Sequence, residues 1–91
     1  MPASMKSRVQ RLTKRQREVV RLTSLGCTLK EAGAVLGLSG NTVDIYRTGA
    51  MKILGANKAA LLTRIAIKYG VSPLDDRLTR SERRKIIGNL D

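Results

Sequence analysis

The sequence predicts an all-α fold, in which four helices form one small domain and a C-terminal extension holds a fifth helix. Two observations predict this fold class. Apolar residues recur at the 3.6-residue spacing of helices, between residue types that start and stop helices. No segment shows the apolar-polar alternation of a half-buried strand. We divide the chain into a basic N-terminal arm (1–11), the helical domain (12–70) and a linker with the extension (71–91).

Each of the four helices has its own start and stop signals. A residue type that favours the N-cap position precedes each helix: Thr13, Thr28, Ser39 and Asn57. A glycine follows each helix: Gly26, Gly37, Gly55 and Gly70. The expected helices therefore cover about residues 14–25, 29–36, 40–54 and 58–69. The first two starts also have capping-box spacing, because Gln16 and Glu31 stand three residues after their caps.

Apolar residues on the last two of these helices are expected to form much of the core: Val43, Ala50, Leu54, Leu61, Leu62, Ile65 and Tyr69. Cys27, after the first helix, is expected to be a small buried apolar residue. In the extension, Pro73 disfavours a helical conformation at Ser72 and marks a linker. Thr79 and Glu82 then repeat the capping-box spacing and predict a fifth helix over about Arg80–Ile87.

The charge balance points to a polyanionic partner. Eighteen Lys and Arg residues against seven Asp and Glu residues give a net charge of +11 on 91 residues. Seven of these cations lie between Lys6 and Arg21, where Glu18 is the single acid. A basic chain of this size attracts nucleic acid from solution, with an anionic membrane as the next candidate.

Several classes of function are disfavoured by what the sequence lacks. It contains no His and one Cys, so it offers neither the usual zinc ligands nor an internal disulfide. It also has no Gly-rich phosphate loop and no paired carboxylates that would replace His in catalysis. No apolar run approaches the ~18 residues of a membrane span, and residues 1–10 lack the apolar stretch of a secretory signal. We therefore expect no catalytic residues, no cofactor, no metal and no membrane contact, and a cytoplasmic, nucleoid-associated location.

The connection between the second and third helices indicates how the chain meets its partner. Gly37-Leu38-Ser39 is a three-residue connection of the kind that sets two helices at a steep angle, which is helix-turn-helix geometry. The third helix places its core residues on one side. A polar stripe lies opposite: Asn41, Ile45, Thr48 and Lys52. An amide, an apolar group for a thymine methyl, a hydroxyl and a cation suit the major groove of DNA.

These segments resemble the LuxR/GerE-type helix-turn-helix domain over about Leu12 to Tyr69. The resemblance rests on these segments: Leu12-Thr13-Lys14-Arg15-Gln16-Arg17-Glu18-Val19-Val20, Lys30-Glu31, Leu36-Gly37-Leu38-Ser39, Thr42-Val43 and Leu54-Gly55. It implies a sequence-specific regulator of transcription that binds double-stranded DNA. It also implies that the third helix enters the major groove, and that the fourth helix pairs two protomers on an operator with two-fold symmetry.

The resemblance and the stripe together assign candidate site residues. The candidates for reading bases are Asn41, Asp44, Ile45 and Thr48. The candidates for contacting DNA phosphates are Lys14, Arg15, Lys30, Thr42, Arg47 and Lys52. The candidates for the dimer interface, on the outward side of the fourth helix, are Ala60, Thr63, Arg64 and Ile67.

Three positions depart from the family pattern. Asp44 stands where the family usually has Lys, and it either repels phosphate, accepts a hydrogen bond from a cytosine amino group, or holds Arg47 in place. Ala32 stands where the family has a large core side chain, and Gly33 after it weakens the helix, so the second helix is either marginal or Leu29 fills the gap in the core. Gly49 costs helix stability in the middle of the third helix.

Two other functions compete with a DNA-binding regulator. Region 4 of sigma factors has a similar Leu-Thr opening and turn, so one alternative is a module that binds promoter DNA and RNA polymerase. The other alternative is a basic RNA-associated interaction protein. The chain has two Tyr and no Phe or Trp, which argues against stacking on single strands.

Overall fold

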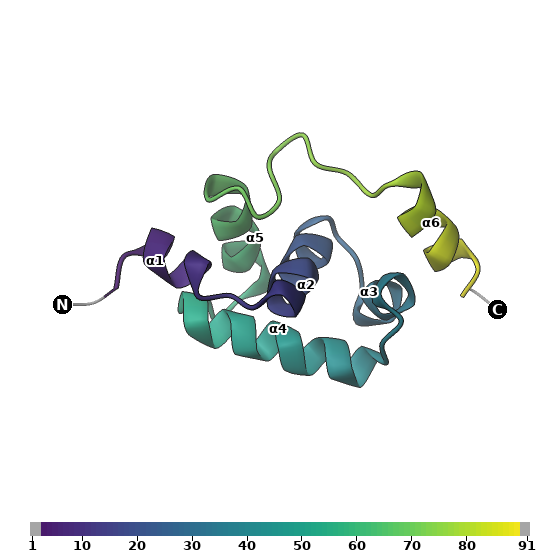
Figure 1. Ribbon diagram of the computed structural model, residues 1–91, viewed down its shortest axis with the longest axis horizontal. Coiled ribbons are helices and arrows are strands. Elements are labelled where there is room, and N and C mark those ends of the chain that lie inside the picture. The colour runs from purple at the N-terminus through teal and green to yellow at the C-terminus, as the bar shows by residue number, and fades with distance from the viewer. Residues whose placement is uncertain (1–2, 90–91) are drawn as a thin grey trace.

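The protein is all-helical in the computed structural model, which describes residues 3–89 and assigns no strand within them. Six helices follow one another in that range: α1 (Met5–Gln10), α2 (Lys14–Ser24), α3 (Leu29–Leu36), α4 (Gly40–Leu54), α5 (Ala59–Lys68) and α6 (Arg80–Ile87). α2 lies at the centre, with α4 and α5 packed against it and α3 beside α4 (Figure 1). The predicted fold class is thereby confirmed.

The predicted capping boxes form as the sequence indicates. The Thr13 hydroxyl accepts from the amide of Gln16 at 3.1 Å, and the Gln16 side chain accepts from the amide of Thr13 at 2.9 Å. The same reciprocal pair joins Thr28 to Glu31 at the start of α3. It also joins Thr79 to Glu82 at the start of α6. The capping-box spacing therefore predicted the starts of three helices correctly.

The start of α5 and the arm differ from the prediction. The N-cap of α5 is Lys58, which makes no side-chain cap hydrogen bond, so the expected cap at Asn57 is wrong. Asn57 stands one residue too early for its side chain to reach the amides of the first turn. The predicted arm contains α1, which the sequence analysis did not foresee, capped by the Ser4 hydroxyl.

α1 is held to the domain by packing and by charge. Its Val9 is buried in the same core cluster as Leu54 and Leu62. Arg8 lies against Gly55, where an added Cβ would stand 2.7 Å from Nη1 of the guanidinium. Gly55 caps the C-terminal end of α4 with φ 67°, and a cation is favourable beside that end of a helix. α1 therefore packs against the helical domain.

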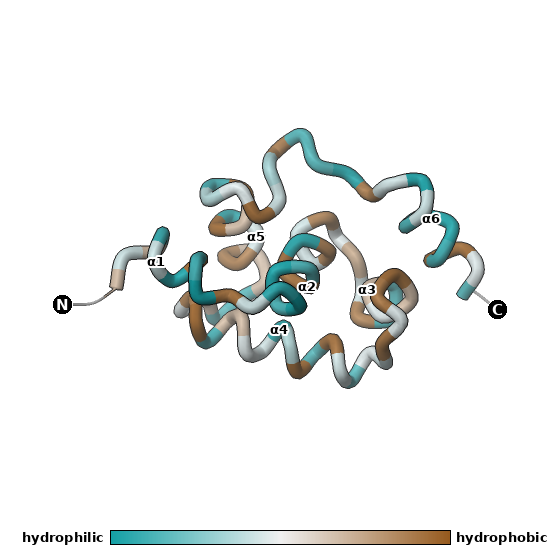
Figure 2. The backbone as a smooth tube through the Cα atoms, in the orientation of Figure 1, coloured by the Kyte–Doolittle hydropathy of each residue, from teal (hydrophilic) through white to brown (hydrophobic). Residues whose placement is uncertain are grey.

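The core consists of two clusters on opposite sides of α2. The first cluster joins α1, α2, α4 and α5: Val9, Leu12, Val20, Ala50, Leu54, Ala56, Leu62, Ile65 and Ala66. The second cluster joins α2, α3 and α4: Val19, Leu22, Ala32, Val35 and Val43. Figure 2 shows hydrophobic residues recurring along α2 to α5, whereas the connection from α5 to α6 is mostly hydrophilic.

One predicted core residue is exposed. Leu62 is fully buried, but the adjacent Leu61 is 41% exposed, so its assignment to the core is wrong. Neighbouring residues on a helix point about 100° apart, and α5 presents only one of the two to α2. Tyr69 is partly buried against the first cluster.

The extension folds back over the domain. α6 spans Arg80–Ile87, the range that the sequence predicts, and it packs against α3. Leu78 and Ile86 pack against the second cluster. Arg21 of α2 donates hydrogen bonds to Asp76 at 2.9 Å and to Glu82 at 2.7 Å, and Ser72, which is 2% exposed, donates to Asp76. α6 therefore has a fixed position beside the helix-turn-helix.

Candidate nucleic-acid interface

The turn between α3 and α4 is built around a close backbone approach. Gly37 ends α3 with φ 70°, and the Leu38 amide donates to the Gly33 carbonyl at 2.9 Å. A Cβ added at Gly33 would collide with the carbonyl oxygen of Leu38. Gly33 is therefore needed for the tight turn, and Leu29 packs partly buried against the second cluster. This packing fits the alternative in which the Leu29 side chain fills the gap in the core beside α3.

The outer face of α4 is the polar stripe that the sequence predicts. Val43, Ala50 and Leu54 are buried on its inner face. On the opposite face, four side chains are exposed: Asn41, Ile45, Thr48 and Lys52. Ile45 is 71% exposed, and an aliphatic side chain in that position contributes nothing to the core. The structure thus brings four of the candidates into one solvent-facing row.

The first turn of α4 borders a hollow that also contains Lys30. The Ser39 hydroxyl accepts from the amide of Thr42 at 3.1 Å and donates to the Thr42 hydroxyl at 2.9 Å. An open hollow of about 600 Å³ lies beside this turn and is lined by Lys30, Gly40 and Asn41 among others. Lys30 is exposed there, at one end of the stripe.

The first turn of α2 approaches α4 at Gly49. A Cβ added at Gly49 would stand 3.0 Å from the side-chain nitrogen of Gln16. At about 100° per residue, Gly49 lies next to Ile45 and Lys52 on the wheel of α4. Gly49 therefore lets the start of α2, with Lys14 and Arg15, come close to one edge of the stripe. No local sequence pattern predicts this contact, because Gly49 and Gln16 lie 33 residues apart in the chain.

Asp44 and Arg47 form an ion pair at the other edge of the stripe. Arg47 Nη2 donates to Asp44 Oδ1 at 2.7 Å, with the Arg47 side chain 33% exposed and Asp44 46% exposed. The Arg47 Nε is buried and has no hydrogen-bond partner among the described residues. The structure therefore brings Asp44 and Arg47 into contact, as the hypothesis that Asp44 orients Arg47 requires.

Comparison with known protein families identifies the helical domain. Residues 10–66 match the GerE family, described as bacterial regulatory proteins of the luxR family. The chain belongs to the LuxR family. The matched residues contain α2, α3 and α4 and nearly all of α5, whereas α6 lies outside them.

Three curated relatives share this part of the LuxR-family chain. Nodulation protein W of Bradyrhizobium diazoefficiens is 37% identical over 70 residues, which are 77% of this chain and 31% of that protein. Transcriptional regulatory protein FixJ of Azorhizobium caulinodans is 35% identical over 69 residues, 76% of this chain and 33% of that protein. Transcriptional regulatory protein UhpA of Escherichia coli is 42% identical over 53 residues, 58% of this chain and 27% of that protein. The chain spans about a third of the length of these relatives, and no solved structure matches it.

Some cations of this LuxR-family domain contact carboxylates or carbonyl oxygens, whereas others make no ion pair. Arg15 pairs with Glu18 at 3.0 Å, and Arg21 is bound by two carboxylates. Arg17 donates to the carbonyl of Val9 at 2.9 Å. Three of the phosphate candidates are exposed and make no ion pair among residues 3–89: Lys14, Lys30 and Lys52. The starts of α2 and α3 and the outer face of α4 each therefore present one exposed cation without an ion-pair partner among these residues.

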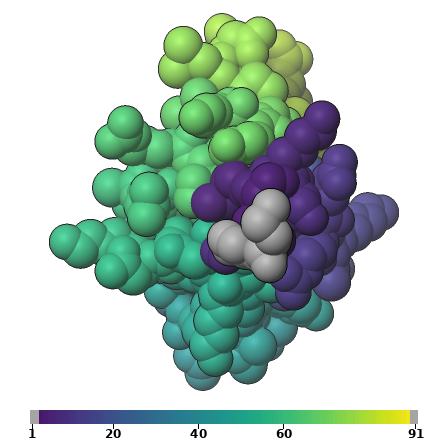
Figure 3. Space-filling view, turned by 90° about the vertical axis from the view of Figure 1, so that its left-hand side faces the viewer, coloured from purple at the N-terminus to yellow at the C-terminus, as the bar shows by residue number. Residues whose placement is uncertain are grey.

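The outward face of α5 lies at the other end of the domain, beside α1. Figure 3 shows α1 covering this end of the molecule, next to α5 and the last turns of α4. Ala60 and Arg64 are exposed, Thr63 is half-buried, and Ile67 is 37% exposed. The dimer candidates thus lie on the surface.

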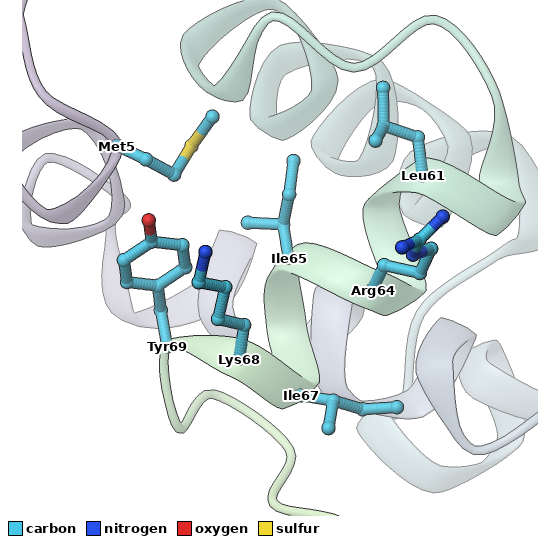
Figure 4. Close-up of a pocket in the computed structure, with 7 residues that line it drawn as sticks. All are labelled: Met5, Leu61, Arg64, Ile65, Ile67, Lys68 and Tyr69. Atoms are coloured by element: carbon cyan, nitrogen blue, oxygen red, sulfur yellow. The ribbon is translucent and has the colours of Figure 1, made fainter.

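A groove of about 610 Å³ runs between α1 and α5. In Figure 4, Met5 reaches from α1 toward Ile65 and Tyr69. The Ile67 side chain points away from Met5. Arg64 and Lys68 add charge to the lining, and Leu61 lies at the same groove. The exposed side of α5 therefore combines apolar and basic groups.

Metal chemistry and membrane insertion receive no support from the described part of the chain. Residues 3–89 contain no cluster of side chains that could hold a metal ion. Within the same residues, every helix is too short or too polar to cross a bilayer. Cys27 is partly buried against the second cluster, and burial raises the pKa of its thiol.

Proposed function

We propose that this chain is a sequence-specific DNA-binding module of a bacterial transcription regulator. The single observation that carries the proposal is the exposed row on α4, opposite a fully buried face and beside a helix-turn-helix connection. The family match supports it, and two of the relatives are named as transcriptional regulatory proteins. No catalytic step is part of the proposal.

In this proposal α4 lies in the major groove and its exposed row faces the base edges. Asn41 is suited to a bidentate contact with adenine, and Ile45 to the methyl group of thymine. Thr48 and Asp44 are the other base-reading candidates. The phosphate contacts come from both sides of the groove: Lys14, Arg15, Lys30, Thr42, Arg47 and Lys52.

We further propose that two copies associate through α5 when they bind DNA. Ile67 and Leu61 are aliphatic side chains that α5 leaves in contact with solvent. Such a small patch is too limited for a stable dimer in solution, where specific interfaces bury on the order of 1,200–2,000 Å². Pairing is therefore expected to be weak in free solution and cooperative on an operator with two-fold symmetry.

The deciding experiment compares nucleic acids at matched salt. The protein is offered a duplex selected from a random pool, a single strand of the same sequence, and a structured RNA. We expect the duplex to bind most tightly. With about 4–6 phosphates neutralised, the slope of log K against log salt concentration should be about −4 to −5.

Each contrary result identifies another function. A flat salt response, or tighter binding to single-stranded DNA, would rule out the proposed module. Preference for the RNA would favour the RNA-associated alternative. The sigma-like alternative would be favoured if the protein captured RNA polymerase and bound only those duplexes that contain a promoter.

A further inference from the structure

The C-terminal helix α6 is a basic element that lies outside the matched family region. It carries four cations on eight residues: Arg80, Arg83, Arg84 and Lys85. Its one acid, Glu82, is engaged by Arg21 of α2. The outward surface of α6 is therefore positively charged, and nothing in the family match accounts for it.

α6 is held in one position relative to the helix-turn-helix. Ile86 and Leu78 pack against the second core cluster, next to side chains of α3. Arg21 contacts both Asp76 and Glu82, one before α6 and one inside it. These contacts set the position of the α6 backbone relative to α3, and its cations stand on the side that faces solvent.

The C-terminal end of α6 lies beside the start of α4. Asn89 lines the same hollow as Lys30, Gly40 and Asn41. The Asn89 side chain donates to the carbonyl of Lys85 at 3.0 Å, one helical turn earlier. Lys85 is exposed in the last turn of α6 and is the cation of that helix nearest in sequence to Asn89 and this hollow.

We propose that the C-terminal end of α6 is a further contact to the backbone of double-stranded DNA, with Lys85 as the cation that contacts a phosphate. This inference rests on the proposed function. With α4 in the major groove, the start of α4 meets one edge of that groove, and the phosphates there are also within the reach of Lys30. Lys85 adds a second cation at that edge and extends the footprint beyond the base pairs that α4 contacts.

The chain offers a matched control on the same helix. Arg80 stands five residues before Lys85, at the opposite end of α6 and about 7.5 Å farther along the helix axis from the end that leads to Asn89. Both side chains are exposed, and neither makes a hydrogen bond or an ion pair among the described residues. Lys85→Glu and Arg80→Glu change the net charge equally. The two variants differ in their distance from the proposed phosphate. Because the Debye length is about 10 Å at 0.1 M salt, the more distant charge at position 80 is screened more strongly from that phosphate.

The experiment measures duplex affinity of the full chain and both variants over a range of salt concentrations. We expect Lys85→Glu to weaken binding about tenfold, equally for all duplex sequences, and to reduce the salt slope by about one unit. Arg80→Glu should weaken it less than about threefold and leave the slope nearly unchanged. Urea unfolding of both variants checks that α6 stays folded.

The outcomes separate this inference from the proposed function. Equal effects of the two variants, with the parent protein still binding duplex steeply with salt, would overturn the role of Lys85 alone. If the parent protein itself shows no salt-dependent duplex binding, the proposed function fails. A larger effect of Lys85→Glu that disappears when the duplex is shortened to the half-site alone supports a contact outside that half-site.

Discussion

Arg21 Nη1 donates a hydrogen bond to Glu82 Oε2 at 2.7 Å and thereby joins α2 to α6. A second nitrogen of the same guanidinium donates to Glu82 Oε1 at 3.1 Å, and Nε donates to Asp76 at 2.9 Å. One cation thus neutralises two carboxylates that come from the connection and from α6. Because all three side chains are less than a quarter exposed, the charges are partly protected from solvent screening.

Replacing Arg21 by Ala should destabilise the protein through the extension. Asp76 and Glu82 would keep their charges without their partner, at an expected cost of about 1–3 kcal/mol in the free energy of unfolding. Urea unfolding measures this cost. Arg80→Ala, which removes an exposed cation from α6, is the control and should change stability by less than about 0.5 kcal/mol. Equal losses in the two variants would show that the bridge contributes nothing beyond net charge.

The same bridge should make stability depend on acidity. The hydrogen bonds from Arg21 hold the pKa values of Asp76 and Glu82 below their ordinary values of about 4. The unfolded chain then binds more protons than the folded one in that range, so stability rises with pH there. The contribution is fully present above about pH 5 and is lost as the pH falls through the lowered values. Urea unfolding at pH 5 and pH 3 should show a larger loss for the parent than for Arg21→Ala, whereas parallel losses would contradict this linkage.

Gly33→Ala should destabilise the protein although Ala favours helices by about 1 kcal/mol. The new Cβ meets the backbone carbonyl of Leu38, which can move only if the turn between α3 and α4 moves. We expect a net loss of about 1–3 kcal/mol, measured by urea unfolding. Gly49→Ala is the comparison variant, because its Cβ would meet the side-chain nitrogen of Gln16 and no backbone atom, so the loss there is limited to the capping box of α2. A gain in stability at both positions would show that the turn tolerates the added carbon.

What could be read from the sequence is set by the distance over which each signal acts. The capping boxes at Thr13, Thr28 and Thr79 span three residues each, so the pattern contains the whole interaction. The contact between Arg21 and Glu82 spans 61 residues, and neither residue signals the other. For the same reason the docking of α6, and the place of Asn89 beside the candidate interface, required the structure. The exposed row on α4 could be predicted because helical periodicity alone separates it from the buried face.

Ile67→Glu should abolish cooperative binding to a two-fold operator while leaving half-site binding intact. A charge in the α5 patch would have to be buried without a partner if two copies met there. Leu74→Glu is the control, since it places the same charge at a side chain that is 85% exposed in the connection before α6. Stoichiometry and cooperativity are measured on an operator with two half-sites about one helical turn apart. Unchanged cooperativity in Ile67→Glu would place the interface elsewhere.

Asp44 stands where the family usually has a cation, and its contact with Arg47 gives that anion a role. Arg47 Nη2 donates to Asp44 Oδ1 at 2.7 Å, one helical turn away on the same helix. We infer that Asp44 is a positioning residue for Arg47 and that its charge is offset by that pair. A carboxylate that only repelled phosphates would weaken binding to every duplex alike.

Replacing Asp44 by Ala should therefore cost about 1–3 kcal/mol of binding free energy on the preferred site and relax one base position. The measurement is the affinity of Asp44→Ala for a panel of single-base operator variants. Arg47→Ala and the double variant complete a mutant cycle: if Asp44 acts through Arg47, the double variant should lose little more than Arg47→Ala alone. Additive losses would instead indicate that Asp44 contacts a cytosine amino group directly. Uniform tightening of Asp44→Ala across the panel would show that Asp44 acts by repulsion, and that neither its pair with Arg47 nor a base contact contributes to specificity.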